Sequence, residues 1–162
     1  MRAIKVPEFW TSRDLRKAEN ATTYEQLAGV AIRALKRQWD RLPAKDTIEV
    51  AVVSGTLTNG GTLPYDVVRK NIRNFGRMIA KLRRMGIPVW DQRPFEKHIF
   101  RIKDLPENAG KPMKLLDGFY KPVFESGLVT LAFMLPNWEQ SHGARWERKL
   151  FRKLGLPIFF VK

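Results

Sequence analysis

The alternation of short apolar segments with longer amphipathic ones constrains the fold of this chain more than any other feature. Residues 48–54 are β-branched and mostly apolar, which is typical of a buried strand. Pro64 stands where a helix can begin, and apolar residues then recur at helical spacing as far as Gly86, which can end the helix. Residues 87–91 form a second short apolar segment. Strand, helix and strand in this order predict a βαβ unit, which implies a parallel sheet with a right-handed crossover.

The same alternation continues toward the carboxyl end of the sequence. The next elements are predicted as a helix, a strand, a helix and a strand, over residues 114–125, 128–135, 143–154 and 156–161 respectively. Gly127 and Gly155 follow the two helices and can end them. The pattern predicts an α/β fold class: a flavodoxin-like three-layer sandwich, in which helices cover both faces of a mainly parallel sheet.

Residues 1–46 do not follow this pattern. We predict a helical N-terminal extension there, packed on a core α/β domain of residues 47–162. Apolar residues in the second half of the extension recur at helical spacing. Thr22 or Thr23 is placed to cap the start of that helix, and Pro43 to stop it.

Residues 92–113 are the least readable part of the sequence. They are polar and interrupted by proline, and no clear period runs through them. A structureless stretch of this length is uncommon inside a compact domain. We therefore expect residues 92–113 either to serve the function or to hold structure that the periodicity of one sequence does not reveal.

The charge of the chain favours anionic partners. Lysine and arginine number 30 against 16 aspartates and glutamates, so the net charge is +14. Such a charge attracts nucleotides, phosphosugars, nucleic acid or acidic surfaces, although solubility alone accounts for it equally well. In the helix expected after Pro64, five cations lie opposite the apolar face: Arg69, Arg73, Arg77, Lys81 and Arg84. This row is either a solvated surface or a contact for nucleic acid.

Composition also argues against several classes of protein and site. No apolar run approaches the roughly 20 residues that a membrane-spanning helix needs, and the first residues lack the apolar stretch of a secretory signal. We therefore expect a cytoplasmic protein without a membrane partner. The chain has no cysteine, and its two histidines, His98 and His142, lack metal-ligand spacing. We expect neither a metal ion nor a cofactor.

Two loops are placed to carry chemistry, because ligands of open parallel sheets bind beyond the carboxyl ends of the strands. The loop after the first strand is rich in glycine and hydroxyl groups, and its candidate binding residues are Ser54, Gly55, Thr56, Asn59, Gly60 and Gly61. Their backbone amides suit close approach to a phosphate or a sugar. The loop matches neither the Walker pattern nor Gly-x-Gly-x-x-Gly, and an ordinary tight turn explains it equally well. The second loop, residues 136–142, leads into a helix.

Glu147, in that helix, is the candidate catalytic residue. It lies three residues before Leu150 and four before Phe151, so the helical period puts it on the buried stripe. Burying an unpaired carboxylate costs free energy, so a carboxylate on the buried stripe indicates either a partner or a function. Either a nearby arginine pairs with Glu147, or the carboxylate serves a reaction.

Two stretches of the sequence carry a family resemblance. One is Val52-Val-Ser-Gly-Thr56 with Asn59-Gly-Gly61, a strand that runs into a glycine loop. The other is Leu135-Pro-Asn-Trp-Glu-Gln-Ser-His-Gly-Ala-Arg-Trp-Glu147, followed by Leu154-Gly-Leu-Pro-Ile158. Together they resemble the nucleoside 2-deoxyribosyltransferase-like family, whose closing segment runs Ser-x-Gly-x-x-x-Glu, a helix, and Gly-x-Pro into the last strand. The likeness is closest to uncharacterised bacterial and phage members, and it covers about 48–91 and 128–161.

The resemblance implies a nucleotide-handling glycosyl enzyme, either an N-glycoside hydrolase or a deoxyribosyltransferase. In that family the matching glutamate attacks the anomeric carbon of a (deoxy)ribosyl group, and this role falls on Glu147. Ser141 matches the residue that contacts the 5′-phosphate in the nucleotide N-hydrolase branch, and the amides of Gly143 and Ala144 complete an anion site. The implied substrate is a nucleoside monophosphate or a related anionic small molecule, and Trp138 is placed to stack on its base.

The sequence departs from the family at the acid that positions the sugar and protonates the leaving base. Residues 125–130 contain no aspartate; Asp91 and Asp117 are the substitutes, and Asp91 is our candidate. An alternative function is therefore a non-catalytic domain that binds or senses nucleotides, and a third is nucleic-acid binding through the row of cations. Family members commonly form dimers, so we expect a homo-oligomer.

Overall fold

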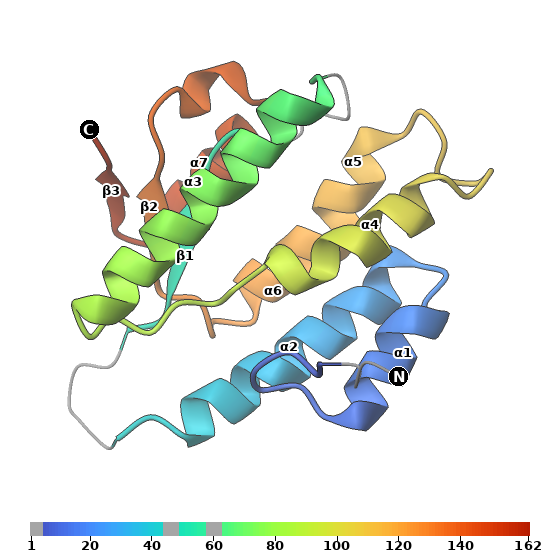
Figure 1. Cartoon of the computed structure of the whole chain (residues 1–162), viewed down its shortest axis with the longest axis horizontal. Helices are drawn as coiled ribbons and strands as arrows, with labels where there is room; N and C mark the ends of the chain where they lie inside the picture. Colours follow the sequence, from blue (N-terminus) through green and yellow to red (C-terminus); the bar gives the residue numbers. More distant parts are fainter. Residues whose placement is uncertain (1–4, 44–48, 58–62) are drawn as a thin grey trace. The chain divides into compact units, whose positions relative to one another are not determined.

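The chain has a mostly helical α/β structure with a small parallel sheet (Figure 1). The computed structural model describes residues 5–43, 49–57 and 63–162. None of the helices within those ranges is long and apolar enough to cross a bilayer. The small parallel sheet among the helices confirms the α/β class that the alternation of segments predicted.

The chain divides into two compact units. One consists of Met1–Asp46 with Gln92–Leu128, and the other of Thr47–Asp91 with Val129–Lys162. Compactness thus groups residues 92–128 with the N-terminal helices. The division into an extension and a core domain at residue 46 stays a prediction.

The sheet belongs to the second unit and is parallel throughout. Its strands are β1 (Ala51–Ser54), β2 (Leu131–Met134) and β3 (Ile158–Phe160), in the order β1-β2-β3. The register pairs Ala51 with Leu131 and Ala132 with Ile158. Each strand is shorter than its predicted segment. At the start of β1, for example, the Val50 amide donates to the Thr130 hydroxyl over 2.9 Å, so a side chain replaces a ladder partner there.

Residues 87–91, predicted as a strand, pair with β1 only through a single bridge between Val89 and Ala51. The Ala51 amide donates to the Pro88 carbonyl, and the Trp90 amide donates to the Ala51 carbonyl, each over 2.9 Å. Since Pro88 has no N–H, the ladder cannot extend toward the start of the segment. The prediction of a full strand was wrong, but its place beside β1 and its parallel direction were right.

A helix covers each face of the sheet. Helix α3 (Tyr65–Arg84) packs on one face, in a cluster made of Ala51, Val53, Phe75, Ile79, Leu82, Val89 and Leu131. Because side chains alternate along a strand, Ser54 points to the face opposite Val53. There it meets Glu147 of α7 (His142–Leu154).

Glycine follows the ends of both helices, as its sequence positions predicted, and a serine caps the start of α7. Gly86 and Gly155 follow α3 and α7 with φ values of +80° and +74°, a left-handed conformation that glycine adopts without steric cost. Helix α7 begins one residue before the predicted Gly143. The reason is that Ser141 caps it by accepting a hydrogen bond from the Ala144 amide.

The first unit is helical in the part that the structure describes. Its helices are α1 (Ser12–Asn20), α2 (Tyr24–Asp40), α4 (Glu96–Lys103), α5 (Pro112–Leu115) and α6 (Lys121–Glu125), with the 3-10 helix η1 (Arg93–Phe95) and the π-helical segment η2 (Leu116–Tyr120). Thr23, one of the two predicted caps, starts α2 in a capping box with Gln26. Thr11 does the same for α1 with Asp14.

Residues 92–113, for which no element was predicted, contain η1, α4 and the start of α5. Phe95, Ile99 and Ile102 are buried, at the spacing of one helical face. The helix was missed because α4 has only eight residues and prolines flank it on both sides. Periodicity over so short a window does not distinguish a helix from a loop.

Candidate functional site

The candidate site is built around one carboxyl group at the carboxyl end of β1. Ser54 is the last residue of β1 and is 1% exposed, and Glu147 of α7 is 7% exposed. The Ser54 hydroxyl donates a short hydrogen bond to the Glu147 carboxylate. The side chain that the helical period put on the buried stripe is therefore buried, and its partner is a serine.

Gly55 lets the chain turn away immediately after that serine. A Cβ atom at position 55 would lie 2.9 Å from the Cβ atom of Leu135, which is closer than real Cβ contacts come. The Leu135 amide in turn donates to the Ser54 carbonyl over 2.8 Å. The carboxyl ends of β1 and β2 are thus held together next to Glu147.

Burial governs the protonation of Glu147. It raises the pKa of this carboxyl from 4.5 to about 7, and the hydrogen bond from Ser54 opposes the rise. A helix dipole favours an ionised carboxylate near the amino end of the helix. That effect fades within the first helical turn, and Glu147 lies six residues beyond the cap Ser141. Desolvation therefore outweighs the helix dipole at this position.

The side chain of Ser141 caps the amino end of α7. Ser141 is buried, and its Oγ accepts from the Ala144 amide over 3.2 Å. The Ala144 amide, predicted to bind a phosphate, is therefore already engaged. The Ser141 hydroxyl keeps its own hydrogen, which it can donate to an anion, and Gly143 lies between the two residues on the same turn.

The loops after β1 and β2 are joined by a hydrogen bond. The Thr56 hydroxyl donates to the Asn137 carbonyl over 3.3 Å, and Asn137 adopts a left-handed conformation with φ of 64°. The structure therefore brings Thr56, a predicted binding residue, beside the loop that leads to α7. Asn59, Gly60 and Gly61, predicted to bind a phosphate or sugar, lie outside the described residues.

Trp138, predicted to stack on a base, lies in the 3-10 helix η3 (Trp138–Gln140) and contacts two side chains. The Arg148 guanidinium lies 5.0 Å from the centre of its ring, and the Phe160 ring lies 5.7 Å away. The Arg148 Nε atom is buried and has no hydrogen-bond partner among the described residues. Sequence reasoning missed Arg148, and its position directly after Glu147 was the only signal available.

Asp91 follows the bridge at Val89 by two residues and is half-buried. Continuing the register makes it level with Val53, whose side chain faces α3, whereas Glu147 lies on the α7 face. Asp117, the other substitute acid, is exposed in η2 of the first unit. The role of Asp91 as an acid stays a prediction.

The predicted row of cations lies on α3, and all five of its side chains are exposed. These residues belong to the same unit as Ser54 and Glu147.

Among the described residues, no group of three His, Asp or Glu side chains has the arrangement of a metal site.

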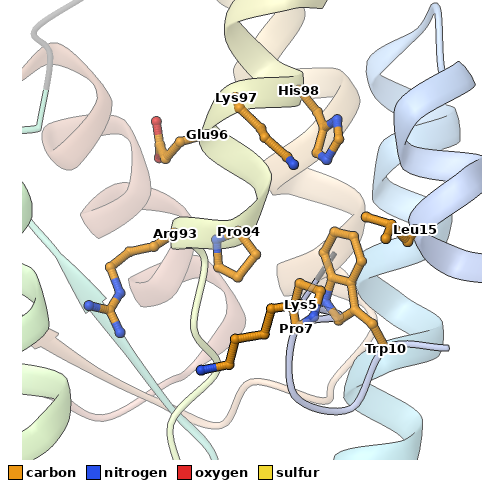
Figure 2. A pocket seen from close by; sticks show the side chains of 9 residues that line it. All are labelled: Lys5, Pro7, Trp10, Leu15, Arg93, Pro94, Glu96, Lys97 and His98. Carbon is orange, nitrogen blue, oxygen red and sulfur yellow. The ribbon is translucent and has the colours of Figure 1, made fainter. Parts of the chain in front are cut away.

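The first unit contains a cavity of about 290 Å³ that sequence reasoning did not predict. Its lining includes Trp10, Pro94, Lys97 and His98, which Figure 2 shows with the other lining side chains. His98 is 3% exposed and its Nε2 atom has no hydrogen-bond partner within the described part of the chain. Burial, followed by the positive charges of Lys97 and Arg101, lowers the pKa of His98 to about 4. The imidazole is therefore neutral at physiological pH.

Comparison with known proteins identifies a family match for part of the chain. A family model described as a domain of unknown function, DUF4406, matches residues 128–160. This segment spans β2, η3, α7 and β3, so it includes Ser141 and Glu147. Curated proteins provide no match, and neither do solved structures.

Proposed function

We propose that this chain is a nucleotide-handling glycosyl enzyme, which cleaves or transfers the N-glycosidic bond of a (deoxy)nucleoside monophosphate with Glu147 as the nucleophile. One observation carries the proposal: a buried carboxyl, hydrogen-bonded by Ser54, lies where the first strand of a parallel sheet ends. Ligands of open parallel sheets bind at that edge, and a carboxyl with a displaced pKa in such a position is a frequent sign of catalysis.

The order of the sheet supports the finer description of the fold. The segment around Val89 pairs with one edge of β1, and β2 pairs with the other edge. Strand β3 lies beyond β2. In chain order these segments are the second, first, third and fourth, which is the order of a flavodoxin-like sheet. The presence of α3 and α7 on opposite faces agrees with a three-layer sandwich.

The proposed reaction takes two steps. A Glu147 carboxylate oxygen bonds to C1′ of the sugar while the C1′–N bond breaks, and the electron pair leaves with the base, which takes up a proton. Water then attacks C1′, loses a proton and releases the carboxylate together with the 5-phosphorylated sugar. A second base in place of water gives transfer instead of hydrolysis.

The electrostatics of the site suit this sequence of steps. Near pH 7 both the protonated and the ionised form of Glu147 are populated, because the pKa of this carboxyl is about 7. The ionised form can attack, and the Ser54 hydrogen bond favours that form. The Ser141 hydroxyl, with its remaining donor, is the proposed contact for the 5′-phosphate.

The test is release of free base. Deoxy- and ribonucleoside monophosphates are incubated with the protein, and free base is separated by chromatography, with and without an added acceptor base. Glu147→Gln preserves the size of the side chain and should lower the rate by at least about a thousandfold. Glu139→Gln, an exposed glutamate of η3, is the matched control and should retain the rate. Absence of base release from every common nucleotide, or full activity of Glu147→Gln, contradicts the proposal.

A non-catalytic nucleotide-binding domain is the second candidate. It is favoured by the missing acid: residues 125–130 contain no aspartate, and by register Asp91 faces the α3 side of the sheet. Nucleoside monophosphates then stabilise the protein against heat without being consumed. Stabilisation that Glu147→Gln retains, with no base released by the natural sequence, favours this candidate.

A further inference from the structure

One exposed face of α3 carries a row of positive charges along most of the helix. The row consists of Arg69, Arg73, Arg77, Lys81 and Arg84, and we call it the α3 basic face. At 100° per residue these positions cover an arc of about 120°, and Phe75, Ile79 and Leu82 lie opposite it. From Arg69 to Arg84 the row extends about 22 Å, at a rise of 1.5 Å per residue.

The charges of this face are not balanced by carboxylates. In the described parts of the chain, Arg73, Arg77, Lys81 and Arg84 take part in no ion pair. The one acidic residue of α3 is Asp66, in its first turn. Like charges four residues apart on a helix repel each other and destabilise it, so the fold gains nothing from the row.

The side chains themselves favour phosphate over general solvation. Four of the five cations are arginines, and a planar guanidinium group can bind two phosphate oxygens at once. Lysines would make the surface equally soluble, so solubility does not explain the excess of arginine. Successive members of the row are mostly four residues apart, about 6 Å along the axis, so the charges repeat regularly as phosphates do along a strand.

An aromatic ring extends the face at its amino end. Tyr65 is 77% exposed, and the Arg69 guanidinium lies 5.8 Å from the centre of its ring. Exposed aromatic rings beside cations are the surfaces on which bases of single-stranded nucleic acid stack. A helix that lies on a membrane instead combines its basic residues with a broad apolar face directed at the lipid. The apolar face of α3 is turned to the sheet.

From these observations we propose that the α3 basic face binds the phosphate backbone of nucleic acid, without sequence specificity. The surface is independent of the proposed glycosyl chemistry, because Glu147 lies on the opposite face of the sheet.

The experiment measures how salt weakens binding to a short labelled single-stranded DNA, followed by fluorescence anisotropy between about 50 and 200 mM salt. Each phosphate contact contributes about 0.7 to the slope of log affinity against log salt for a single strand. The double variant Arg73→Gln/Arg77→Gln should therefore lower that slope by about 1.4 and weaken binding by about tenfold or more at 100 mM salt.

The matched control is Lys149→Gln/Lys153→Gln, two exposed cations four residues apart on α7. It removes the same charge from the same unit, and it should leave the slope nearly unchanged. Thermal melting of both double variants verifies that they fold. Glu147→Gln should bind DNA like the natural sequence, so loss of glycosyl activity and loss of DNA binding are separate results.

Three outcomes overturn the proposal. The first is absence of salt-dependent DNA binding by the natural sequence. The second is an equal effect of the control pair, which would show that net charge alone attracts DNA. The third is tighter binding to phosphatidylserine vesicles than to DNA with the same dependence on Arg73 and Arg77, which would assign the face to a membrane surface.

Discussion

At the scale of single residues, the hydrogen bond between Ser54 and Glu147 decides how the carboxyl can be used. Burial raises the pKa of Glu147 to about 7, and the Ser54 hydroxyl limits the rise by stabilising the charged form. In the proposed reaction Glu147 attacks as the carboxylate, and the hydrogen bond from Ser54 favours that form. Ser54 is then a positioning residue, which acts through Glu147.

Replacing Ser54 with alanine should raise the pKa of Glu147 further. A hydrogen bond to a charged group contributes about 1.5 kcal/mol or more, so the expected increase is about one pH unit. The measurement is an NMR titration of the glutamate side-chain carboxyl carbons. If the protein turns over nucleotides, the acid limb of its pH–rate profile moves upward by the same amount. An unchanged or lower pKa in Ser54→Ala would show that the hydrogen bond does not stabilise the carboxylate.

At the scale of secondary structure, α7 connects the loop after β2 to the buried carboxyl. Its cap Ser141 ends the loop, and Glu147, Leu150 and Phe151 follow on the buried side. An exposed hydrogen bond also links the loop to α7, because the Arg145 guanidinium donates to the Glu139 carbonyl over 2.5 Å. The start of the helix therefore fixes where Glu147 lies relative to β1.

Loss of the cap should destabilise the protein measurably. Ser141→Ala leaves the Ala144 amide without its partner, and removal of a serine cap costs about 1 kcal/mol, or up to about 2 kcal/mol in a protein. Because Ser141 is buried, water does not replace the hydroxyl readily, and we expect the upper part of that range. Urea denaturation measures the change in the free energy of unfolding.

Ser141→Thr is the matched variant for this prediction, since threonine retains a capping hydroxyl. It should keep most of the stability that Ser141→Ala loses. Equal loss in both variants would indicate that the size of the side chain matters at this buried position, and that the hydrogen bond to the Ala144 amide does not.

At the scale of the whole molecule, Glu147 in one compact unit and His98 in the other are both buried, and they respond to pH in opposite directions. Glu147 has a folded-state pKa of about 7 against 4.5, so its contribution to stability is present below pH 4.5 and is lost as the pH rises to about 7. His98 has a folded-state pKa of about 4 against 6.5, so its contribution is present above pH 6.5 and is lost as the pH falls to about 4.

These opposite dependences predict a nearly flat stability between pH 4.5 and 6.5 for the natural sequence. In the natural sequence, ionisation of Glu147 lowers the free energy of unfolding by about 3 kcal/mol as the pH rises from 4.5 to about 7. Glu147→Gln removes this decrease, so the His98 contribution is unopposed and the stability of the variant should rise with pH. His98→Phe leaves the Glu147 dependence unopposed, so its stability should fall as the pH rises. The lowered pKa of Asp14 acts below 3.8, outside this interval.

Chemical denaturation at a series of pH values measures all three proteins. If Glu147→Gln and His98→Phe show the same pH dependence as the natural sequence, burial does not shift the two pKa values in the directions given. A steep dependence in the natural sequence would indicate that the two contributions do not offset each other.

Much of the local structure follows from the sequence because its causes are local. Gly86 and Gly155 end helices through backbone conformations that glycine adopts freely, and Thr23 caps α2 through a hydrogen bond to a residue three positions away. The burial of Glu147 follows from its spacing to Leu150 and Phe151 in the same helix. Each of these features depends on neighbours within about one turn of the chain.

Tertiary structure decides the features whose partners are distant along the chain. Ser54 and Glu147 are 93 residues apart, and the helical period that buries a carboxylate cannot indicate which residue will donate a hydrogen bond to it. The same holds for Arg148, whose position over Trp138 and Phe160 depends on how α7, η3 and β3 meet. Single-sequence patterns carry the conformational preferences of neighbouring residues, whereas these contacts arise from packing between elements, and packing also sets the pKa of the buried carboxyl.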